Sequence, residues 1–365
     1  MPARSAANIF ARRVSALRQR IEAAEVGGLV DAHPPNVQYL TGFTGSAGVF
    51  LLTPRDAILF TDSRYRIQAR EEARNVEVRV ESVRLHTAAG KALRGRHRRP
   101  VIYSPEHTSV AQRHELAQAS GRGVRWMAVE GVVEELRSVK DESEIAVMRE
   151  AARLAEEALS EVLKLVKPGV EENDLAAEIE YRMRRKGASG AAFPTIVASG
   201  PRAALPHAQP SRKRIAKNEL VVFDLGAILR GYCSDLTRTV HVGRASARVR
   251  EWYRAVLEAQ AAARAILRPG VDGAAVDAAA RGRLRRSGLA RYFTHSTGHG
   301  LGREVHEIPR LARLSRSVIR AGQVVTLEPG IYIQGVGGIR IEDDIVVRED
   351  GTESLTQLNR ELLEL

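Results

Sequence analysis

Two acidic residues in the C-terminal half of the sequence stand beside strand-like apolar residues and could share a cation. Asp224 ends the apolar run 220–223, and Asp235 lies on the strand that returns after the turn at 229–231. Burying a carboxylate at the end of a strand is costly unless a positive charge compensates it. We therefore expect a hairpin with one acid on each strand and a cationic partner for both.

A second segment repeats this arrangement. Glu328 ends the apolar run 324–327, and after the glycine-rich stretch 335–338 the returning strand 339–341 leads to Glu342. Four converging carboxylates carry a charge of about −4, which two divalent ions would neutralise, as in two-metal hydrolytic sites. Acids on solvated faces or paired with arginines are the simpler explanation for one hairpin, but a poorer one for two matched hairpins.

Three histidines add nitrogen and proton-transfer chemistry. His299 stands in the glycine-rich segment 297–302, where the backbone can approach a ligand closely. One imidazole among four carboxylates is an oxygen-rich set that favours Mn²⁺, with Co²⁺ or Zn²⁺ as alternatives. His207 and His306 stand near these residues in the sequence, and we expect them to contact substrate and transfer protons.

Three further residues are candidates for supporting roles. Arg340 lies two positions before Glu342, so strand alternation places both on one face, and we expect Arg340 to steady a ligand carboxylate. His295 and Arg310 are candidates for substrate or supporting contacts. The remaining histidines lack such a context and are expected to be structural.

An internal repeat accounts for the matched acids. Lys-Pro-Gly-Val at 167–170 recurs as Arg-Pro-Gly-Val at 268–271, and the basic, glycine-ended stretch 184–187 recurs at 285–288, both at an offset of 101 residues. In each copy a long helix stops at Pro-Gly, a second helix follows, and strand-like sequence comes next. The repeat predicts an α+β domain of two halves related by a pseudo-twofold axis, with the site between them.

The 365 residues favour two domains, which we place at residues 1–130 and 138–365. The first has the alternating pattern of an α/β domain, including a hairpin split by Pro54. The second begins with a long helix that carries Asp141, Glu142 and Glu144 in its first turn. In the first domain we expect helices over 6–24, 64–74 and after 108, and strands over 28–30, 49–52, 57–60, 76–80 and 101–103.

The composition excludes several classes of protein. The net charge of +12 invites a nucleic-acid partner, but the basic residues are mostly arginines scattered among acids, and no aromatic residues interleave with the densest cluster. No apolar run approaches the roughly 18 residues of a membrane span, and the first residues lack a secretory apolar region. The single cysteine, Cys233, fits a reducing compartment. We expect a cytoplasmic protein that binds neither nucleic acid nor membrane.

The ordered set of acids with one histidine resembles the pita-bread metallopeptidases: methionine aminopeptidase, aminopeptidase P and prolidase. His207 and His306 resemble the two substrate-side histidines of that family. The residues that resemble its five metal ligands are Asp224, Asp235, His299, Glu328 and Glu342.

Two segments near the N-terminus extend the resemblance to almost the whole chain. Residues 39–43 and 60–65 resemble the creatinase-like N-terminal domain of the proline-specific members, which methionine aminopeptidases lack. The resemblance implies an α/β creatinase-like domain followed by a pita-bread catalytic domain. One departure is Arg303, where these enzymes usually carry an aliphatic residue, so the side-chain preference stays open.

The resemblance also implies an activity, namely hydrolysis of the Xaa-Pro bond in short peptides with proline in second position. Asp224 and Glu342 would bridge or flank two ions, Asp235 would bind mainly one of them, and His299 and Glu328 would bind the other. Glu328 would pass a proton from the attacking water to the proline nitrogen. We expect an Xaa-Pro aminopeptidase and a homodimer, although no pattern in the sequence reveals the oligomeric state.

Three alternatives stay open. The first is an Xaa-Pro dipeptidase (prolidase), because Arg310, in the stretch 306–310, resembles the arginine with which prolidases hold the free carboxylate. Residues 60–65 and 297–300 look more like aminopeptidase P, which is why the aminopeptidase is our first expectation. The second is a metal-free creatinase-like enzyme, and the third is a catalytically inactive pita-bread binding protein. Both are disfavoured because all five ligands are present.

Overall fold

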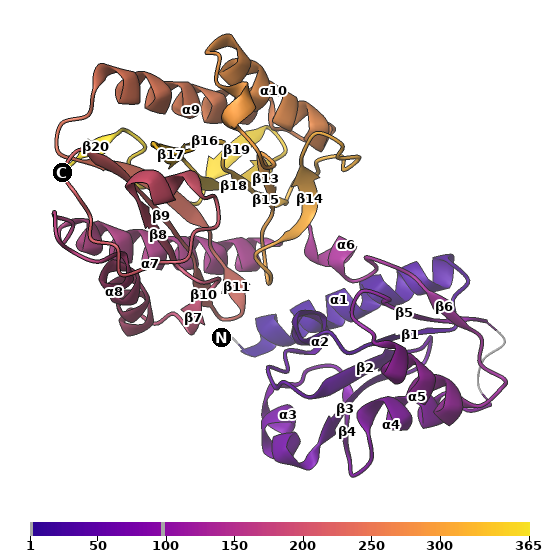
Figure 1. Ribbon diagram of the computed structural model, residues 1–365. Coiled ribbons are helices and arrows are strands. Elements are labelled where there is room, and N and C mark those ends of the chain that lie inside the picture. Colours follow the sequence, from indigo (N-terminus) through magenta and orange to yellow (C-terminus); the bar gives the residue numbers. More distant parts are fainter. Residues whose placement is uncertain (1–2, 96–98) are drawn as a thin grey trace. The chain divides into compact units, whose positions relative to one another are not determined.

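The computed structural model describes residues 3–95 and 99–365 (Figure 1). The chain divides into two compact units, Met1–Arg137 and Ser138–Leu365. Among the residues described, no helix combines the length and apolar character needed to cross a membrane.

The first unit is built on a mixed six-stranded sheet in the order β4-β3-β2-β1-β5-β6. Alternation along β2 covers both faces: Phe50 and Leu52 pack with α1 and α2, whereas Val49 and Leu51 pack with α4 and α5. The unit is therefore a three-layer α/β/α domain. Its strands are β1 (Gly28–Asp31), β2 (Gly48–Leu52), β3 (Ala57–Asp62), β4 (Glu77–Glu81), β5 (Val101–Tyr103) and β6 (Trp126–Ala128). Its helices are α1 (Ala3–Ala23), α2 (Pro34–Thr41), α3 (Arg66–Glu72), α4 (Leu85–Ala92), α5 (Val110–Ser120) and α6 (Glu134–Arg137), with a 3₁₀ turn, η1 (Ser63–Tyr65).

Most expected elements of this unit are confirmed, and two differ. The helix expected over 64–74 is shorter, because the side chain of Asp62 accepts a hydrogen bond from the backbone N–H of Arg64 and holds a 3₁₀ turn before α3. Helix α2 was not expected. It is short, begins with two prolines and ends at Gly42 in the left-handed region, so it lacks the long apolar period that marks a helix in sequence.

The second unit consists of two helix pairs and two larger sheets. α7 starts as expected, because Asp141 accepts hydrogen bonds from the N–H groups of Ser143 and Glu144 and forms a capping box with Glu144. The sheets have the orders β20-β12-β9-β8 and β14-β13-β15-β18-β19. The helices are α7 (Glu142–Leu163), α8 (Glu172–Arg185), α9 (Ala247–Ile266) and α10 (Gly273–Arg286), with 3₁₀ turns η2 (Gly200–Ala204) and η3 (Ala290–Tyr292). The strands are β7 (Gly190–Ala191), β8 (Ile196–Ser199), β9 (Glu219–Leu225), β10 (Ala227–Leu229), β11 (Tyr232–Cys233), β12 (Leu236–Val242), β13 (Gly298–Gly300), β14 (Glu307–Leu311), β15 (Val324–Leu327), β16 (Gly330–Ile333), β17 (Gly337–Arg340), β18 (Asp343–Arg348), β19 (Gly351–Ser354) and β20 (Leu363–Glu364).

The internal repeat corresponds to these two halves. Within the second unit, Figure 1 shows α7 and α8 on one side of the strands and α9 and α10 on the other. The repeated glycines lie in the turns that follow α7 and α9, in a backbone conformation that disfavours other residues: φ is 95° at Gly169 and 84° at its equivalent Gly270. The repetition of glycine therefore has a local structural cause.

The second hairpin is not the one that we expected. β15 pairs with β18, whereas residues 339–341 belong largely to β17, which pairs with β16. The first half has a similar insertion, because β10 and β11 separate β9 from its partner β12. Glu342 and Asp235 consequently stand in equivalent places, each directly before the strand that returns to its half's first strand.

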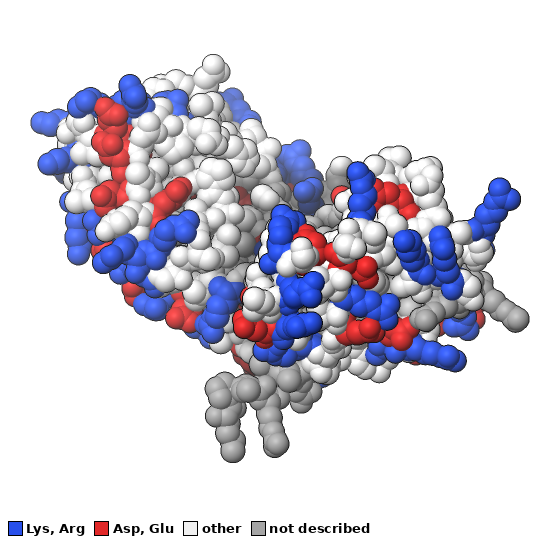
Figure 2. Space-filling model, turned by 90° about the horizontal axis from the view of Figure 1, so that it is seen from below, with Lys and Arg blue, Asp and Glu red and all other residues white. Residues whose placement is uncertain are grey.

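Exposed basic residues stand close to acids. On the face shown in Figure 2, lysines and arginines are interspersed with aspartates and glutamates. On α8, for example, Arg182 forms ion pairs with Glu161 and Glu178, and Lys186 beyond it pairs with Glu157. Positive charge at such places is locally compensated.

Candidate metal centre

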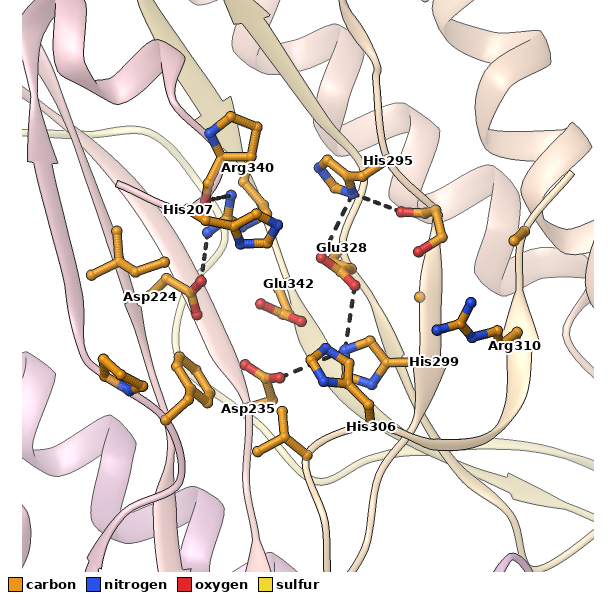
Figure 3. Close-up of a pocket in the computed structure, with 18 of the residues that line it drawn as sticks. His207, Asp224, Asp235, His295, His299, His306, Arg310, Glu328, Arg340 and Glu342 are labelled. Atoms are coloured by element: carbon orange, nitrogen blue, oxygen red, sulfur yellow. Dashed lines mark hydrogen bonds and ion pairs between the residues drawn. The ribbon is translucent and has the colours of Figure 1, made fainter. Parts of the chain in front are cut away.

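The second unit contains a pocket of about 340 Å³ that brings together all the residues with expected functional roles. Figure 3 shows their side chains converging from both halves. The ten residues are His207, Asp224, Asp235, His295, His299, His306, Arg310, Glu328, Arg340 and Glu342.

The strand ladders fix the four acids. Asp224 lies in β9, opposite Thr237 in β12. Asp235 precedes β12, and its backbone N–H donates to the carboxylate of Asp344 (3.0 Å). The N–H of Glu342 donates to the carbonyl of Thr237 (3.1 Å), which ties an acid of the second half to a strand of the first. Rigid backbone therefore holds the carboxylates together despite their repulsion.

His299 lies in β13, between β14 and β15, and its flanking glycines are explained by close packing. A Cβ atom on Gly298 would lie 2.0 Å from the carbonyl oxygen of Thr326, and one on Gly300 would lie 2.2 Å from that of Ile308. We expected these glycines to admit a ligand, but the neighbouring strands β15 and β14 take up that space.

The tautomer of His299 follows from its hydrogen bond. Its Nδ1 lies 3.1 Å from the carbonyl oxygen of Gly300, and because a carbonyl only accepts, Nδ1 carries the proton. Nε2 is thus left with a free lone pair. It lies 3.5 Å from Glu328 and 3.8 Å from Asp235.

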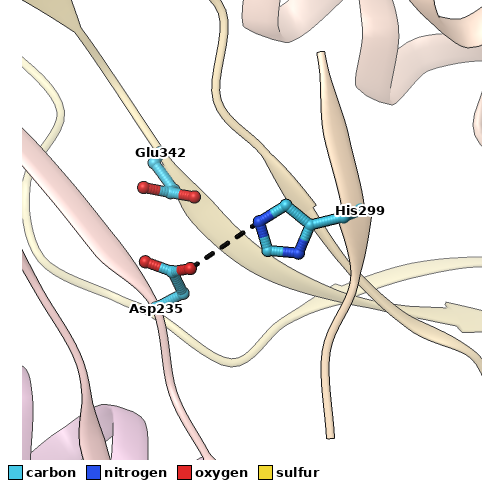
Figure 4. Close-up of side chains that lie close together, drawn as sticks. All are labelled: Asp235, His299 and Glu342. Carbon is cyan, nitrogen blue, oxygen red and sulfur yellow. Dashed lines mark ion pairs between the residues drawn. The ribbon is translucent and has the colours of Figure 1, made fainter. Parts of the chain in front are cut away.

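Three of these residues are close enough to bind one ion. One ligand atom from each of Asp235, His299 and Glu342 lies within 4.8 Å of the other two (Figure 4). Such a spacing leaves room for a cation at the centre, at the usual oxygen and nitrogen ligand distances of about 2.0–2.2 Å.

The buried acids of the pocket carry negative charge that a bound cation would stabilise. Burial and the neighbouring acids raise the pKa values of Asp235 and Glu342 well above their ordinary range, and burial raises that of Glu328 to about 8. Burial lowers the pKa of His299 to about 4, so its imidazole is neutral. In addition, the Oδ1 atom of Asp224 is buried and accepts no hydrogen bond from any described residue. A neutral imidazole among buried carboxylates, with an acceptor atom to spare, fits divalent metal ions.

Arg340 compensates part of the negative charge. Its guanidinium donates to Asp224 (2.5 Å), an acid of the other half, rather than to the neighbouring Glu342. Its Nε donates to the hydroxyl of Thr237, which in turn donates to Glu342 (2.6 Å). One buried arginine thereby orients two carboxylates, one directly and one through a hydroxyl.

Tyr332 joins Arg340 to His295. Its hydroxyl accepts from Arg340 (2.6 Å) and lies 2.8 Å from Nε2 of His295, whose Nδ1 lies 2.8 Å from the carbonyl of Ser296. Both ring nitrogens of His295 are thus hydrogen-bonded within the protein, and Nδ1 also lies 3.8 Å from the carboxylate of Glu328. Burial lowers the pKa of His295 to about 3.

The remaining three residues lie on the open side of the pocket. His207, His306 and Arg310 are exposed, and in Figure 3 they point into the pocket from its edge. The ring of His306 lies 4.3 Å from that of His299, and partial burial lowers the pKa of His306.

Thr237 and Tyr332 are site residues that sequence reasoning missed. Thr237 carried a signal, because it stands two residues after Asp235 and so shares a strand face with it. Tyr332 carried none, since its contact with Arg340 depends on the pairing of β16 with β17, which places it opposite Gly338.

Metal-free protein should lose stability as the pH rises. A carboxyl group whose pKa is raised in the folded state favours folding while it is protonated, and this advantage is lost as the pH passes from the unfolded value through the folded one, about 8 for Glu328. We expect the melting temperature of chelated protein to fall as the pH rises from about 4.5 to about 8, and to fall less in Glu342→Gln.

The control for this measurement is the same scan with Mn²⁺ bound, in which most of the decline should disappear. A chelated parent protein that melts at the same temperature throughout this range would contradict the electrostatic account.

Comparison with known proteins supports the architecture. A model of the Metallopeptidase family M24 matches residues 146–349, and a model of the Creatinase/Prolidase N-terminal domain matches residues 13–139. The Xaa-Pro dipeptidase of Pyrococcus horikoshii is 36% identical over 357 residues, which cover 98% of this chain and 100% of that protein.

Two solved structures superpose over nearly the whole chain. The Xaa-Pro dipeptidase from Bacillus anthracis has a TM-score of 0.93 at 36% identity and covers 98% of this chain and 100% of its own. The X-Pro aminopeptidase from Thermotoga maritima has a TM-score of 0.89 at 36% identity, with 96% and 99% covered. The expected architecture, a creatinase-like domain followed by a pita-bread domain, is confirmed. The chain belongs to metallopeptidase family M24 and carries the creatinase-type N-terminal domain.

Proposed function

We propose that this protein is a metal-dependent Xaa-Pro dipeptidase, which hydrolyses the bond between an N-terminal residue and proline. The observation that carries the proposal is a single pocket that combines a five-residue donor set with an exposed arginine, Arg310, at its edge. The names and near-complete coverage of the relatives from Pyrococcus horikoshii and Bacillus anthracis support it.

Five residues would hold two divalent ions. The oxygen-rich donor set favours Mn²⁺, with Co²⁺ or Zn²⁺ as alternatives. When bound, such ions make water a nucleophile at neutral pH and polarise the scissile carbonyl. The proposed ligands are Asp224, Asp235, His299, Glu328 and Glu342.

The chain's own residues would transfer the protons and orient the substrate. Glu328 lies 3.5 Å from Nε2 of His299 and would accept a proton from the attacking water and deliver it to the proline nitrogen, which must be protonated to leave. His207 and His306 face the open side of the pocket, where they would contact the scissile carbonyl and the flanking groups. Arg340 would keep Asp224 oriented.

The choice between dipeptides and longer peptides rests on Arg310. A dipeptide ends in a carboxylate directly after proline, and in a tripeptide this group lies one residue, about 3.5 Å, further away. An arginine at the edge of the pocket can bind the nearer carboxylate with a charge-assisted hydrogen bond. Such an arrangement favours the shorter substrate.

We expected an aminopeptidase from the sequence, and the relatives support the dipeptidase better. One of the two motifs behind that expectation, 60–65, belongs to the first unit and does not line the pocket. The aminopeptidase is the second candidate, favoured by the similarity to the Thermotoga maritima enzyme. The metal-free and inactive alternatives are disfavoured by the complete donor set. A homodimer and a cytoplasmic location stay predictions.

Metal content gives the first test. Protein loaded with Mn²⁺ should hold two ions per chain, whereas Asp235→Asn should hold at most one and lose nearly all activity, because a neutral amide is a weaker ligand. His207→Ala is the control, since this exposed residue should be dispensable for metal binding. Full activity after exhaustive chelation would end the two-metal proposal.

Substrate charge gives the second test. Compared with Ala-Pro, its amide Ala-Pro-NH₂ keeps the scissile bond and lacks only the carboxylate. Arg310→Ala should lower kcat/KM for Ala-Pro about 10- to 100-fold, because a hydrogen bond to a charged group contributes a free energy of that size. It should change kcat/KM for the amide by less than about threefold.

Arg313→Ala is the matched control, because Arg313 is exposed in the turn directly after β14 and does not line the pocket. The parent should also prefer Ala-Pro to Ala-Pro-Ala. Better turnover of the tripeptide, with Arg310→Ala affecting both substrates equally, would favour the aminopeptidase instead.

A further inference from the structure

Gly273, the first residue of α10, touches the backbone of Arg310. A Cβ atom at position 273 would lie 2.2 Å from the carbonyl oxygen of Arg310 and 2.9 Å from the hydroxyl of Ser315. Carbon–oxygen contacts in proteins normally start near about 3.3 Å, so any larger residue would push these segments apart by about 1 Å. The start of α10 is therefore in direct contact with the strand that carries Arg310.

Backbone hydrogen bonds hold this contact in place. The N–H of Gly273 donates to the carbonyl of Ser317 (2.8 Å), and the N–H of Ile319 donates to that of Val271 (2.9 Å). These bonds join the approach to α10 to the segment that follows β14. β14 itself is an edge strand, paired with β13 alone among the described strands.

Helix α10, on one side of this contact, is held in place by its own buried interactions. On α10, Asp277 forms a buried ion pair with Arg281 and accepts hydrogen bonds from the N–H and hydroxyl of Thr297, which precedes β13. Because α10 is held from within and β14 is an edge strand, pressure at position 273 should displace β14 rather than the helix.

The equivalent place in the first half of the repeat has a similar connection and a different residue. Glu172 is the first residue of α8, and its N–H donates to the carbonyl of Lys213, as that of Gly273 donates to Ser317. Its buried carboxylate accepts hydrogen bonds from Ser199 and Ser211, which bracket the loop that carries His207. In each half, the first residue of the second helix thus contacts the segment that bears a substrate-side residue.

From this equivalence we propose that Gly273 is a positioning residue for substrate selection, acting through Arg310. Without a side chain at 273, α10 presses against β14 and keeps the guanidinium at the distance at which it meets the carboxylate of a dipeptide. The inference rests on the proposed function, specifically on the role of Arg310.

The test measures the preference for Ala-Pro over Ala-Pro-NH₂ in metal-loaded protein. Gly273→Ala should remove most of this preference, because a displacement of about 1 Å can cost up to about 100-fold in rate. Turnover of the amide and the metal content should stay close to those of the parent, because the N–H of His299 donates to the hydroxyl of Thr326 in β15, on the side away from β14. If Gly273 served stability alone, the substitution would lower the turnover of both substrates by the same factor.

The matched control is Gly282→Ala in the same helix, where the space around a Cβ atom is open. This variant should keep the parent's preference. In the Arg310→Ala background, Gly273→Ala should have no further effect on the ratio, since the residue through which it acts is gone. A preserved preference in Gly273→Ala, or an added effect in the double variant, would overturn the inference.

Two outcomes separate this inference from the proposed function. If Arg310→Ala leaves the preference intact, the proposed role of Arg310 fails whatever Gly273 does. If Arg310→Ala abolishes it and Gly273→Ala does not, only the role of Gly273 fails.

Should Gly273→Ala not fold, the double variant Ala274→Gly, Ala275→Gly loosens the first turn of α10 without adding atoms. It should weaken the preference, and an unchanged preference there would overturn the inference.

Discussion

The repulsion between four carboxylates in one buried pocket is the constraint on which the catalytic unit is organised. Left to themselves these groups would separate or take up protons, as the raised pKa values of Asp235, Glu328 and Glu342 indicate. Strand pairing prevents separation, because each acid is part of, or adjacent to, a hydrogen-bonded ladder. Arg340 cancels only part of the charge. The remainder is the electrostatic basis for binding divalent ions.

The two halves of the repeat share this task unequally. Both supply two acids at equivalent ends of strands, but only the second supplies a nitrogen donor, His299. The substrate-side residues are divided as well, with His207 from the first half and His306 and Arg310 from the second. On the proposed function, a duplicated scaffold would thus provide matched ligands for the ions and unmatched groups for an asymmetric peptide. The two halves also differ at the first residue of their second helix, which is Glu172 in the first half and Gly273 in the second.

Much of this site could be predicted from the sequence, because its main residues carry local signals. Acids after apolar runs, a histidine between glycines and a repeat of 101 residues are all visible without coordinates. The predictions that were wrong or missing concern contacts that depend on the pairing of strands. The strand returning to β15 was misplaced because two candidate strands follow it, and Tyr332 was missed because its contacts exist only once β16 and β17 pair. The close contact of Gly273 with Arg310 joins residues far apart in the chain and has no local signature either.

The hydrogen bond between His299 and the carbonyl of Gly300 has a consequence for how the pocket exchanges ions with its surroundings. With Nδ1 protonated and a pKa of about 4, the imidazole meets an arriving ion without losing a proton. Glu328, whose pKa is raised to about 8, does hold a proton near neutrality, and this proton must leave before the group can bind an ion. On the proposed function, ion uptake would therefore acidify the medium, and the apparent affinity would rise with pH until Glu328 is ionised. The pH dependence of metal binding would thus be set by the pKa values of the carboxyl groups rather than by that of His299.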